Sequence, residues 1–318
     1  MLAVVAPGQG AQTPGFLKPW LAESSFADRL NWLSAVSGVD LARHGTESDA
    51  ETIRDTAIAQ PLLVASGLLA ALELFPHPAD AFPYIAVAAG HSVGEIAAYA
   101  IAGVISADEA VSLAATRGAE MAKACALEPT GMSALLGGDE DEVLARLDAL
   151  DLVPANRNAA GQIVAAGAVS ALDKLAEDPP ARARVRRLAT AGAFHTQYMA
   201  SALEGYAAVA ERIVAAEPTV TLLSNADGRP VTTAAEAMTK LVAQMTRPVR
   251  WDLCTATMRD LFDQASGQGG ITAIVEFPPA GTLTGIAKRE LKGTPAHPIK
   301  SPADLDGLAT TFASLRAG

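Results

Sequence analysis

Residues 84–100, YIAVAAGHSVGEIAAYA, join a short apolar run, a G-x-S-x-G motif and a run of small, helix-favouring residues. The apolar run is too short for an independent helix and predicts a buried strand, whereas residues 95–100 predict the first turns of a helix, with Glu95 at its positive end. A strand, a cramped turn and a helix lift a serine hydroxyl out of the backbone, with amide groups nearby. Ser92 is therefore the candidate nucleophile. The alternative is that it only caps the helix.

The order of apolar and helical patterns indicates an α/β fold. Candidate strands at 2–6, 85–89, 220–224 and 271–277 alternate with longer segments of helical period, which favours an open, largely parallel sheet. Between about 127 and 191 the pattern changes to strand, helix, strand, strand, helix, strand, which is typical of a ferredoxin-like (βαββαβ) unit. We expect a large α/β domain, 1–126 and 192–318, an inserted ferredoxin-like small domain, 127–191, and a ligand cleft between them.

Composition excludes several classes of protein. Of the 318 residues, 50% are hydrophobic and 19% are charged, which is ordinary for a globular enzyme with a sizeable core. No uninterrupted apolar run reaches the roughly 18 residues of a membrane span, and the first residues lack the basic region of a signal peptide. Cys125 and Cys254 offer no disulfide framework and no metal-ligand cluster. We expect a cytoplasmic protein that spans no membrane, and its net charge of −11 argues against nucleic-acid binding.

A serine nucleophile needs a base, and His195 is the best placed of the histidines. It lies where a glycine-bearing turn enters an amphipathic helical segment, which would hold the ring stiffly beside a cleft. The alternative is a histidine that only satisfies a helix terminus. His91 would leave the turn on another side from Ser92, so we expect it to orient or pack. Asp227 and Asp252 look like turn and helix-start residues, and a backbone carbonyl can orient the base instead of a triad acid.

Two further features fit acyl chemistry. An oxyanion hole needs two backbone donors, and the N–H of Val93, the residue after the nucleophile, is one of them. The loop APGQGAQTPG after the first strand could bring the N–H of Gln9 close, although it also suits an ordinary strand exit. Arg117 lies on an otherwise small and apolar helix face, where its guanidinium could hold a carboxylate. Its spacing allows equally well a surface arginine paired with Glu120 or an aspartate.

Nine motifs follow one another along nearly the whole chain: PGQGAQ (7–12), GHSVGE (90–95), TRGAEM (116–121), GMSALLG (131–137), ANRNAAGQIVAAG (155–167), GAFHTQYM (192–199), SNADG (224–228), QMTRPVRW (244–251) and VEFPPAGTLTGIAKR (275–289). Together they resemble the malonyl-CoA:acyl carrier protein transacylases of fatty-acid synthesis and the related acyltransferase domains of polyketide synthases. The resemblance implies a hydrolase-like α/β domain with a ferredoxin-like insertion, in agreement with the pattern of elements.

The resemblance also implies roles for individual residues. Ser92 would be the acylated nucleophile and His195 its base, oriented by the backbone carbonyl of Gln244 in place of an acid. The remaining implied site residues are the oxyanion amides of Gln9 and Val93, the carboxylate-binding Arg117, and the further substrate-binding candidates His91, Asn158, Phe194 and Gln244. The implied reaction is a ping-pong transfer of malonyl from malonyl-CoA to the phosphopantetheine thiol of acyl carrier protein, and it needs no metal ion and no redox cofactor.

The resemblance extends to substrate choice. Polyketide acyltransferases that select malonyl tend to carry a branched aliphatic residue after the nucleophile and a phenylalanine before the histidine, as this chain does with Val93 and Phe194. A bulky Phe194 would leave no room for the extra methyl of methylmalonyl, although one methyl is worth only about 1–3 kcal/mol. Two alternatives stay open. The first is a serine hydrolase with the same turn, although related editing hydrolases commonly lack the carboxylate-binding arginine that this chain has at Arg117. The second is a catalytically silent docking module.

Carrier proteins of this kind are acidic, and this chain is acidic too. A local basic face must therefore bring the two together. The candidates are Arg182, Arg184, Arg186, Arg187, Lys288, Arg289 and Lys292. The alternative is a scatter of solvated charges. We expect a monomer, and the sequence leaves the pathway, fatty-acid or polyketide synthesis, open.

Overall fold

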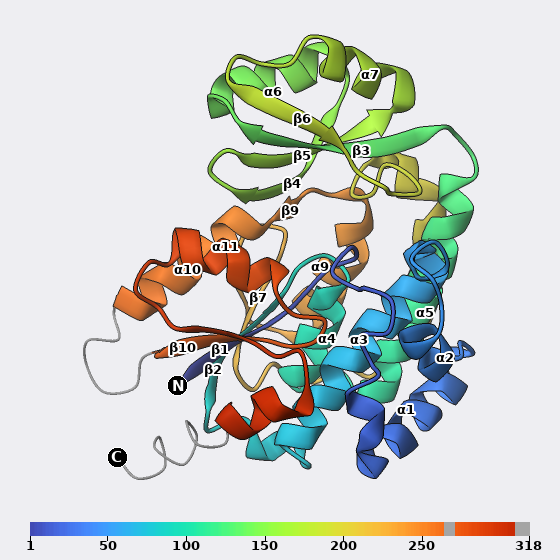
Figure 1. Ribbon diagram of the computed structural model, residues 1–318, viewed down its shortest axis with the longest axis vertical. Helices are drawn as coiled ribbons and strands as arrows, with labels where there is room; N and C mark the ends of the chain where they lie inside the picture. Colours follow the sequence, from blue (N-terminus) through green and yellow to red (C-terminus); the bar gives the residue numbers. More distant parts are fainter. Residues whose placement is uncertain (264–270, 309–318) are drawn as a thin grey trace.

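Six strands form a mostly parallel sheet in the computed structural model, which describes residues 1–263 and 271–308 (Figure 1). Their order is β11-β10-β1-β2-β7-β8, and β8 is antiparallel to β7. Their bounds are β1 Leu2–Ala6, β2 Ile85–Gly90, β7 Thr221–Leu223, β8 Pro230–Val231, β10 Ala273–Glu276 and β11 Ala296–Pro298. The predicted strands of the large domain are β1, β2, β7 and β10, so these predictions are confirmed. Two segments of the predicted large-domain range, 264–270 and 309–318, lie outside the described residues.

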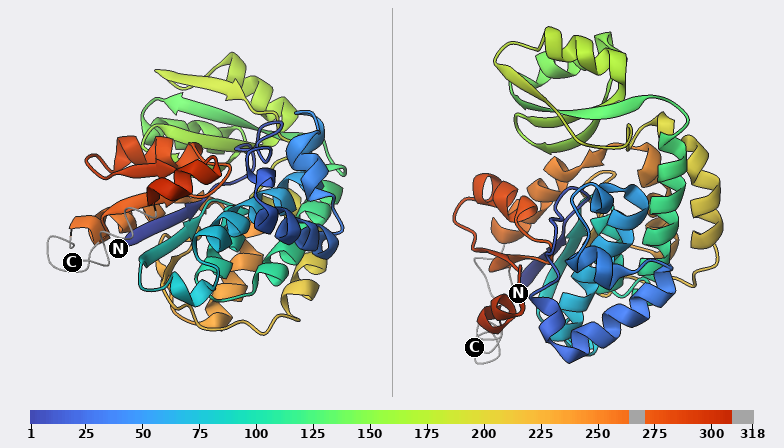
Figure 2. Two further views of the ribbon diagram at one scale, coloured as in Figure 1. Left: turned by 60° about the horizontal axis from the view of Figure 1, so that its bottom comes forward. Right: turned by 45° about the vertical axis from the view of Figure 1, so that its right-hand side comes forward.

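Helices bury both faces of this sheet (Figure 2). Because side chains alternate along a strand, Leu2 and Val4 enter one core cluster and Ala3 and Val5 enter the other. A strand buried on both faces needs apolar residues at every position, which explains the unbroken run LAVVA. The core cluster on the first face also contains residues of α1 Ser24–Ser37, α2 Leu41–Thr46, α3 Thr56–Leu74, α4 Gly94–Ile101, α5 Ala107–Cys125, α8 Leu203–Ala210 and α9 Ala234–Ala243. The cluster on the second face contains residues of α10 Trp251–Asp263 and α11 Thr282–Glu290.

Helix α3 bears on the expectation that the chain has no apolar run as long as a membrane span. It is long and apolar enough to meet the criteria for a membrane-spanning helix, although Gln60 and Glu73 interrupt its sequence. In the fold, 67% of its most apolar window is buried against other elements. Its hydropathy is therefore accounted for by its place in the core between the large sheet and α5.

The second sheet has the order β6-β3-β5-β4-β9. Its elements are β3 Thr130–Gly137, α6 Glu140–Ala149, β4 Val153–Ala159, β5 Gln162–Ala168, α7 Val169–Glu177 and β6 Ala183–Arg187. This is the predicted ferredoxin-like succession. Helices α6 and α7 cover the face of the sheet turned away from the large sheet, and Leu135, Leu147 and Leu175 pack between them (Figure 1).

The large domain adds a strand to this small sheet. β9 (Val249–Arg250) pairs in parallel with β4, and Val249 and Arg250 lie opposite Asn156 and Arg157. This strand has only two residues, too few for a periodic pattern to indicate it. The chain enters the small sheet after α5 ends at Cys125 and leaves it after β6 ends at Arg187. The predicted domain boundaries at 126/127 and 191/192 stay predictions.

Candidate active site

The candidate nucleophile lies in the turn between β2 and α4. A Cβ added to Gly90 would lie 2.0 Å from the carbonyl carbon and oxygen of Gly94, and one added to Gly94 would lie 2.2 Å from the carbonyl oxygen of Ala6. Only glycine permits these approaches. Ser92 itself adopts φ 54°, a left-handed conformation that L-residues adopt at a cost. Its N–H donates to Oδ1 of Asn225 at 2.8 Å, which holds this turn in place.

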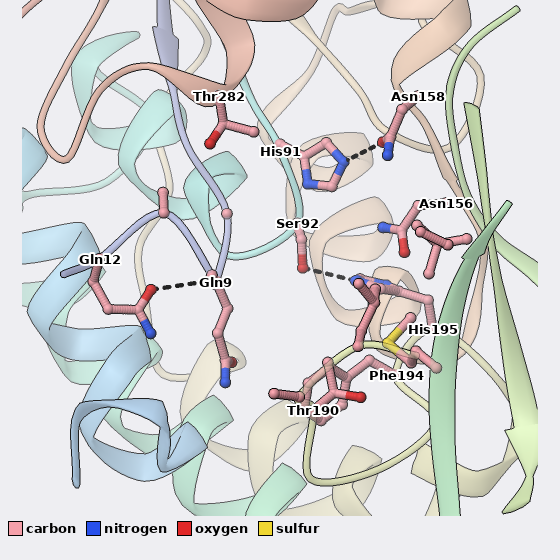
Figure 3. Close-up of a pocket in the computed structure, with 18 of the residues that line it drawn as sticks. Gln9, Gln12, His91, Ser92, Asn156, Asn158, Thr190, Phe194, His195 and Thr282 are labelled. Carbon is pink, nitrogen blue, oxygen red and sulfur yellow. Dashed lines mark hydrogen bonds between the residues drawn. The ribbon is translucent and has the colours of Figure 1, made fainter. Parts of the chain in front are cut away.

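Ser92 and His195 form a hydrogen-bonded pair (Figure 3). Oγ of Ser92 lies 2.7 Å from Nε2 of His195, and Nδ1 of His195 lies 2.9 Å from the carbonyl oxygen of Gln244. Because a carbonyl only accepts, Nδ1 carries the hydrogen and Nε2 has a free lone pair for the serine O–H. His195 is followed by a 3₁₀ turn, Gln197–Ala202, and then by α8, so the predicted helical segment is divided into a 3₁₀ part and an α-helical part.

The environment keeps His195 neutral. Burial, followed by the positive charge of Arg117, lowers its pKa from the ordinary 6.5 to about 3. The ring can therefore accept a proton from Ser92 throughout the neutral range. Asp227 pairs with Lys240, and Asp252 pairs with Arg250. Nδ1 of His195 contacts the Gln244 carbonyl and neither of these aspartates, which fits the predicted dyad.

Of the two predicted oxyanion residues, Gln9 lines the same cavity as Ser92, and Val93 follows Ser92 in the turn. The loop after β1 packs closely against the turn that bears Ser92, because a Cβ added to Gly8 would lie 2.8 Å from the carbonyl oxygen of His91. Within the described part of the chain, the backbone N–H groups of Gln9 and Val93 donate to no protein acceptor. The side chain of Gln9 is anchored apart from them, since its Nε2 donates to Arg54 O at 3.1 Å. Neither backbone N–H is thus used by a protein acceptor, and the oxyanion role of the two amides stays a prediction.

Arg117 is a buried cation that faces this pocket. Its side chain is 1% exposed on α5, so the alternative of a surface arginine is wrong, and Glu120 pairs with Lys123 instead. Nη1 donates to Oε1 of Gln60 and Nη2 to Oε1 of Gln244, each at 2.8 Å. Its Nε has no partner, and in the described residues no carboxylate forms a salt bridge with it. Such a guanidinium is prepared to bind an anion.

His91 and Asn158 lie side by side in the wall of the pocket (Figure 3). Nε2 of His91 and Oδ1 of Asn158 lie 2.8 Å apart, and the His91 ring packs at a tilt against Trp251. Burial lowers the pKa of His91, which favours the neutral ring. This residue therefore orients Asn158 and packs, as expected.

These groups line a cavity of about 510 Å³, which is the size of an ordinary small-molecule site. Gln9, His91, Ser92, Arg117, Asn158, Phe194 and His195 all line it. Two predicted site residues do not. The side chain of Val93 is packed in the core, and Gln244 lies behind Arg117, which it contacts.

The comparisons with known proteins agree with this geometry. A family model described as an acyl transferase domain matches residues 4–303. A malonyl CoA-acyl carrier protein transacylase from Mycolicibacterium smegmatis is 72% identical over 92% of this chain and 99% of that protein. The chain belongs to the malonyl CoA-acyl carrier protein transacylase family. A relative of the same name from Mycobacterium tuberculosis is 66% identical over 97% of this chain and 99% of its own length.

Solved structures of this transacylase family have the same fold. The crystal structure of MCAT from Mycobacterium tuberculosis is 65% identical, has a TM-score of 0.90, and covers 97% of this chain and 99% of its own. A malonyl-transacylase solved with its type II PKS acyl-carrier protein is 27% identical with a TM-score of 0.85, over 96% of this chain and 97% of its own. The predicted fold class, a hydrolase-like α/β domain with a ferredoxin-like insertion, is thereby confirmed.

Sequence reasoning missed two residues of this transacylase site and gave a third only a local role. Gln60 on α3 holds Arg117, and Asn225 after β7 holds Ser92. Glu95 was expected only as an acidic residue in the first turn of α4, yet it is 1% exposed and contacts Gln244 and Asn225. Gln60 lies in none of the nine motifs. Asn225 lies within SNADG, but the motif gave no sign of its contact with Ser92, which is far away along the chain.

Proposed function

We propose that this acyltransferase moves malonyl from malonyl-CoA to the phosphopantetheine thiol of acyl carrier protein through an ester on Ser92. The observation that carries the proposal is the buried guanidinium of Arg117, which lines the same cavity as Ser92 and His195 and lacks a protein carboxylate partner among the described residues. A malonyl thioester offers a carbonyl to the serine and a carboxylate to the arginine. The names of the relatives state these substrates for those proteins.

In the first half-reaction Ser92 is acylated. Its Oγ attacks the thioester carbonyl while its proton passes to Nε2 of His195 over the 2.7 Å contact. The N–H groups of Gln9 and Val93 stabilise the oxyanion of the tetrahedral intermediate. The carbon–sulfur bond then breaks, and the imidazolium returns the proton to the CoA sulfur. Throughout, the Gln244 carbonyl keeps the ring oriented through Nδ1.

In the second half-reaction the carrier thiol regenerates the serine. The thiol gives its proton to His195 as its sulfur attacks the ester carbonyl. The ester C–O bond breaks, and Oγ of Ser92 takes the proton back from the imidazolium. Binding the malonyl carboxylate at Arg117 fixes the ester carbonyl beside the two amides, which favours attack by a positioned thiol over attack by water.

The cavity supports a preference for malonyl over methylmalonyl. Phe194 lines the cavity next to His195 and is 7% exposed, so its ring is held in place by packing. An added methyl on the malonyl group would have to displace it. Support from Val93 is indirect, because its side chain lies in the core. The two substrates differ by one methyl group, so we expect kcat/KM for malonyl to exceed that for methylmalonyl by about 10–200-fold.

Part of the basic surface faces the cleft. In the pairing of β6 with β3, Arg186 lies opposite Ala134 and Arg184 opposite Leu136, on the face that lines the cavity. Arg187 lies on the other face, where it pairs with Asp173 of α7. Arg289 of α11 donates to Oε1 of Gln162 on the same side as Arg184. We infer that Arg184, Arg186, Lys288 and Arg289 receive the acidic carrier protein and that Arg187 does not.

Mass spectrometry of the intact protein tests the proposed function. Incubation with malonyl-CoA should add one malonyl group, mapped to Ser92, and the S92A variant should stay unmodified. Holo carrier protein should then remove the group and become malonylated. Rapid loss of malonyl-CoA without carrier would indicate a hydrolase, and the absence of any adduct on the folded protein would indicate a docking module.

Three expectations stay predictions. They are that the protein works as a monomer in the cytoplasm, that it spans no membrane, and that no resident metal or redox cofactor takes part. Its pathway is open as well. A panel of fatty-acid and polyketide carrier proteins, compared by kcat/KM for malonyl transfer, would show which of them it serves.

A further inference from the structure

Glu95 is a buried carboxylate behind the pocket. It lies in the first turn of α4, is 1% exposed and does not line the cavity, so substrate cannot touch it. Burying a carboxylate is costly unless hydrogen bonds compensate. The proposed reaction, which uses Ser92, His195 and Arg117, gives this residue no role.

Both oxygens of Glu95 accept hydrogen bonds from groups that hold the site. Oε1 accepts the backbone N–H of Asn225 at 2.6 Å, and Oε2 accepts Nε2 of Gln244 in a short contact. The side chain of Asn225 in turn accepts the N–H of Ser92. One carboxylate therefore joins the nucleophile turn to Gln244.

Gln244 is the residue through which Glu95 reaches the pocket. Its amide oxygen accepts Nη2 of Arg117, its amide nitrogen also donates to Ser92 O at 3.0 Å, and its backbone carbonyl orients His195. A side-chain amide can turn over, which would set its NH₂ against the guanidinium, donor against donor. An acceptor at Oε2 of Glu95 holds the nitrogen on the far side and leaves the oxygen for Arg117.

We propose, on the basis of the proposed function, that Glu95 is a positioning residue whose ionised carboxylate fixes the Gln244 amide and so presents Arg117 to the carboxylate of the substrate. Its effect is expected on the binding of malonyl groups more than on the binding of uncharged acyl groups. The role requires that both oxygens accept. A proton on either oxygen would face an N–H donor and break one of the two contacts.

The surroundings place this protonation in the neutral range. Burial raises the pKa of Glu95 to about 7, against the opposing effects of the Asn225 N–H, Gln244 and the charges of Arg117 and Lys240. The other titratable groups facing it are Tyr99 on α4, Tyr206 on α8 and Cys254 on α10, and burial raises the pKa of all three, which keeps them neutral. Glu95 is therefore ionised above about pH 7 and protonated below it. The KM for malonyl substrates should rise as the pH falls.

The test compares malonyl-N-acetylcysteamine with acetyl-N-acetylcysteamine, which lack the phosphates of CoA. In wild-type enzyme the KM for the malonyl compound should rise about tenfold from pH 8 to pH 5.5, with an inflection near 7, and the acetyl KM should stay level. The E95Q variant should show the high malonyl KM at every pH. E142Q, a change at an exposed glutamate in the first turn of α6, serves as the matched control and should behave as wild type.

The outcomes separate this inference from the proposed function. Equal changes in the malonyl and acetyl KM, or an inflection in the pH profile that survives in E95Q, would overturn the positioning role. The proposed function would still stand if Ser92 is malonylated. Absence of a malonyl-Ser92 ester in the wild type would overturn the proposed function itself. If E95Q fails to fold, the wild-type profile decides alone: a malonyl KM that stays level across pH 7 contradicts the proposal.

Discussion

At the scale of single residues, Arg117 is a positive charge that the fold buries between two amides without neutralising it. Replacing it with alanine should lower kcat/KM for malonyl-CoA at least 100-fold, since two charge-assisted hydrogen bonds to the substrate are lost, each worth about 1.5–3 kcal/mol. Acetyl-CoA, which has no carboxylate, should lose little or gain. Steady-state kinetics with both thioesters measures the change in selectivity.

The acetyl-CoA rate serves as the internal control for R117A, because it shows that the Ser92–His195 pair is intact. A second control is R146A, which removes a surface arginine paired with Asp178 on the small domain. An R117A enzyme that keeps its ratio of malonyl to acetyl transfer would show that the guanidinium does not bind the substrate carboxylate.

The pKa of His195 gives a second prediction at this scale. Burial and the charge of Arg117 lower it to about 3, so the ring is neutral, and active as a base, at every pH above that value. Acylation of Ser92 by p-nitrophenyl acetate, a neutral ester, should therefore stay level as the pH falls through 6.5 and decline only toward pH 3 to 4. The burst of p-nitrophenol measures this rate, with H195A as the inactive control. An inflection near 6.5 would mean that the ring is solvated.

Linear motifs predicted the residues that stand inside them, and the geometry brings Ser92, His195 and the Gln244 carbonyl together as expected. They did not predict Gln60, which lies in none of the motifs, and the motif SNADG contains Asn225 without indicating what it contacts. An amide that holds a guanidinium or a backbone N–H has no periodicity and no required neighbour, and these two meet their partners only after the chain has folded. For the same reason the sequence did not indicate that the side chain of Gln244 bridges Arg117 and Glu95, in addition to the contact of its carbonyl with His195.

At the scale of elements, the turn between β2 and α4 depends on Gly94. A Cβ there would lie 2.2 Å from Ala6 O and 2.6 Å from Pro7 O, so either the loop bearing Gln9 or the turn bearing Ser92 must move. We expect G94A to lower kcat/KM at least 100-fold, because a displacement of about 1 Å costs that much, and to destabilise the fold by about 1–3 kcal/mol. Malonylation rates and thermal unfolding measure the two effects.

G285A is the matched control for this substitution. Gly285 lies inside α11, and an added Cβ would meet nothing within 4 Å. Alanine there should leave activity unchanged and stabilise the helix by up to about 1 kcal/mol. A G94A enzyme as active and stable as G285A would contradict the steric argument.

Elements with strong periodicity or a clear apolar run were predictable, among them the three-residue strand β7, and three other short strands were not. The ferredoxin-like succession follows from its alternating patterns, and the core strands follow from apolar runs. Strands β8, β9 and β11 have only two or three residues each, and they exist because neighbouring strands offer free hydrogen-bonding edges. Such pairing is a property of the assembled sheet, so the local sequence carries little trace of it.

At the scale of the whole molecule, a chain with net charge −11 must receive an acidic partner on a local basic surface. We expect R186E to raise the KM for carrier protein about tenfold without changing the KM for malonyl-CoA, because Arg186 lies on the cleft face of β6. R187E makes the same change in charge on the opposite face and should have little effect. Equal effects of the two variants, or equal effects on both substrates, would count against this surface.

The two-residue strand β9 has a consequence for exchanging parts between relatives. It extends the small sheet along β4, and it begins three residues after the 3₁₀ turn Gln244–Thr246, whose first residue orients His195. A chimaera that imports residues 127–191 from another transacylase would bring a foreign β4 against a native β9. A mismatch between the two strands would shift Gln244 and with it the His195 ring. A graft of the small domain that also carries residues 244–250 is therefore expected to keep more activity than one that does not.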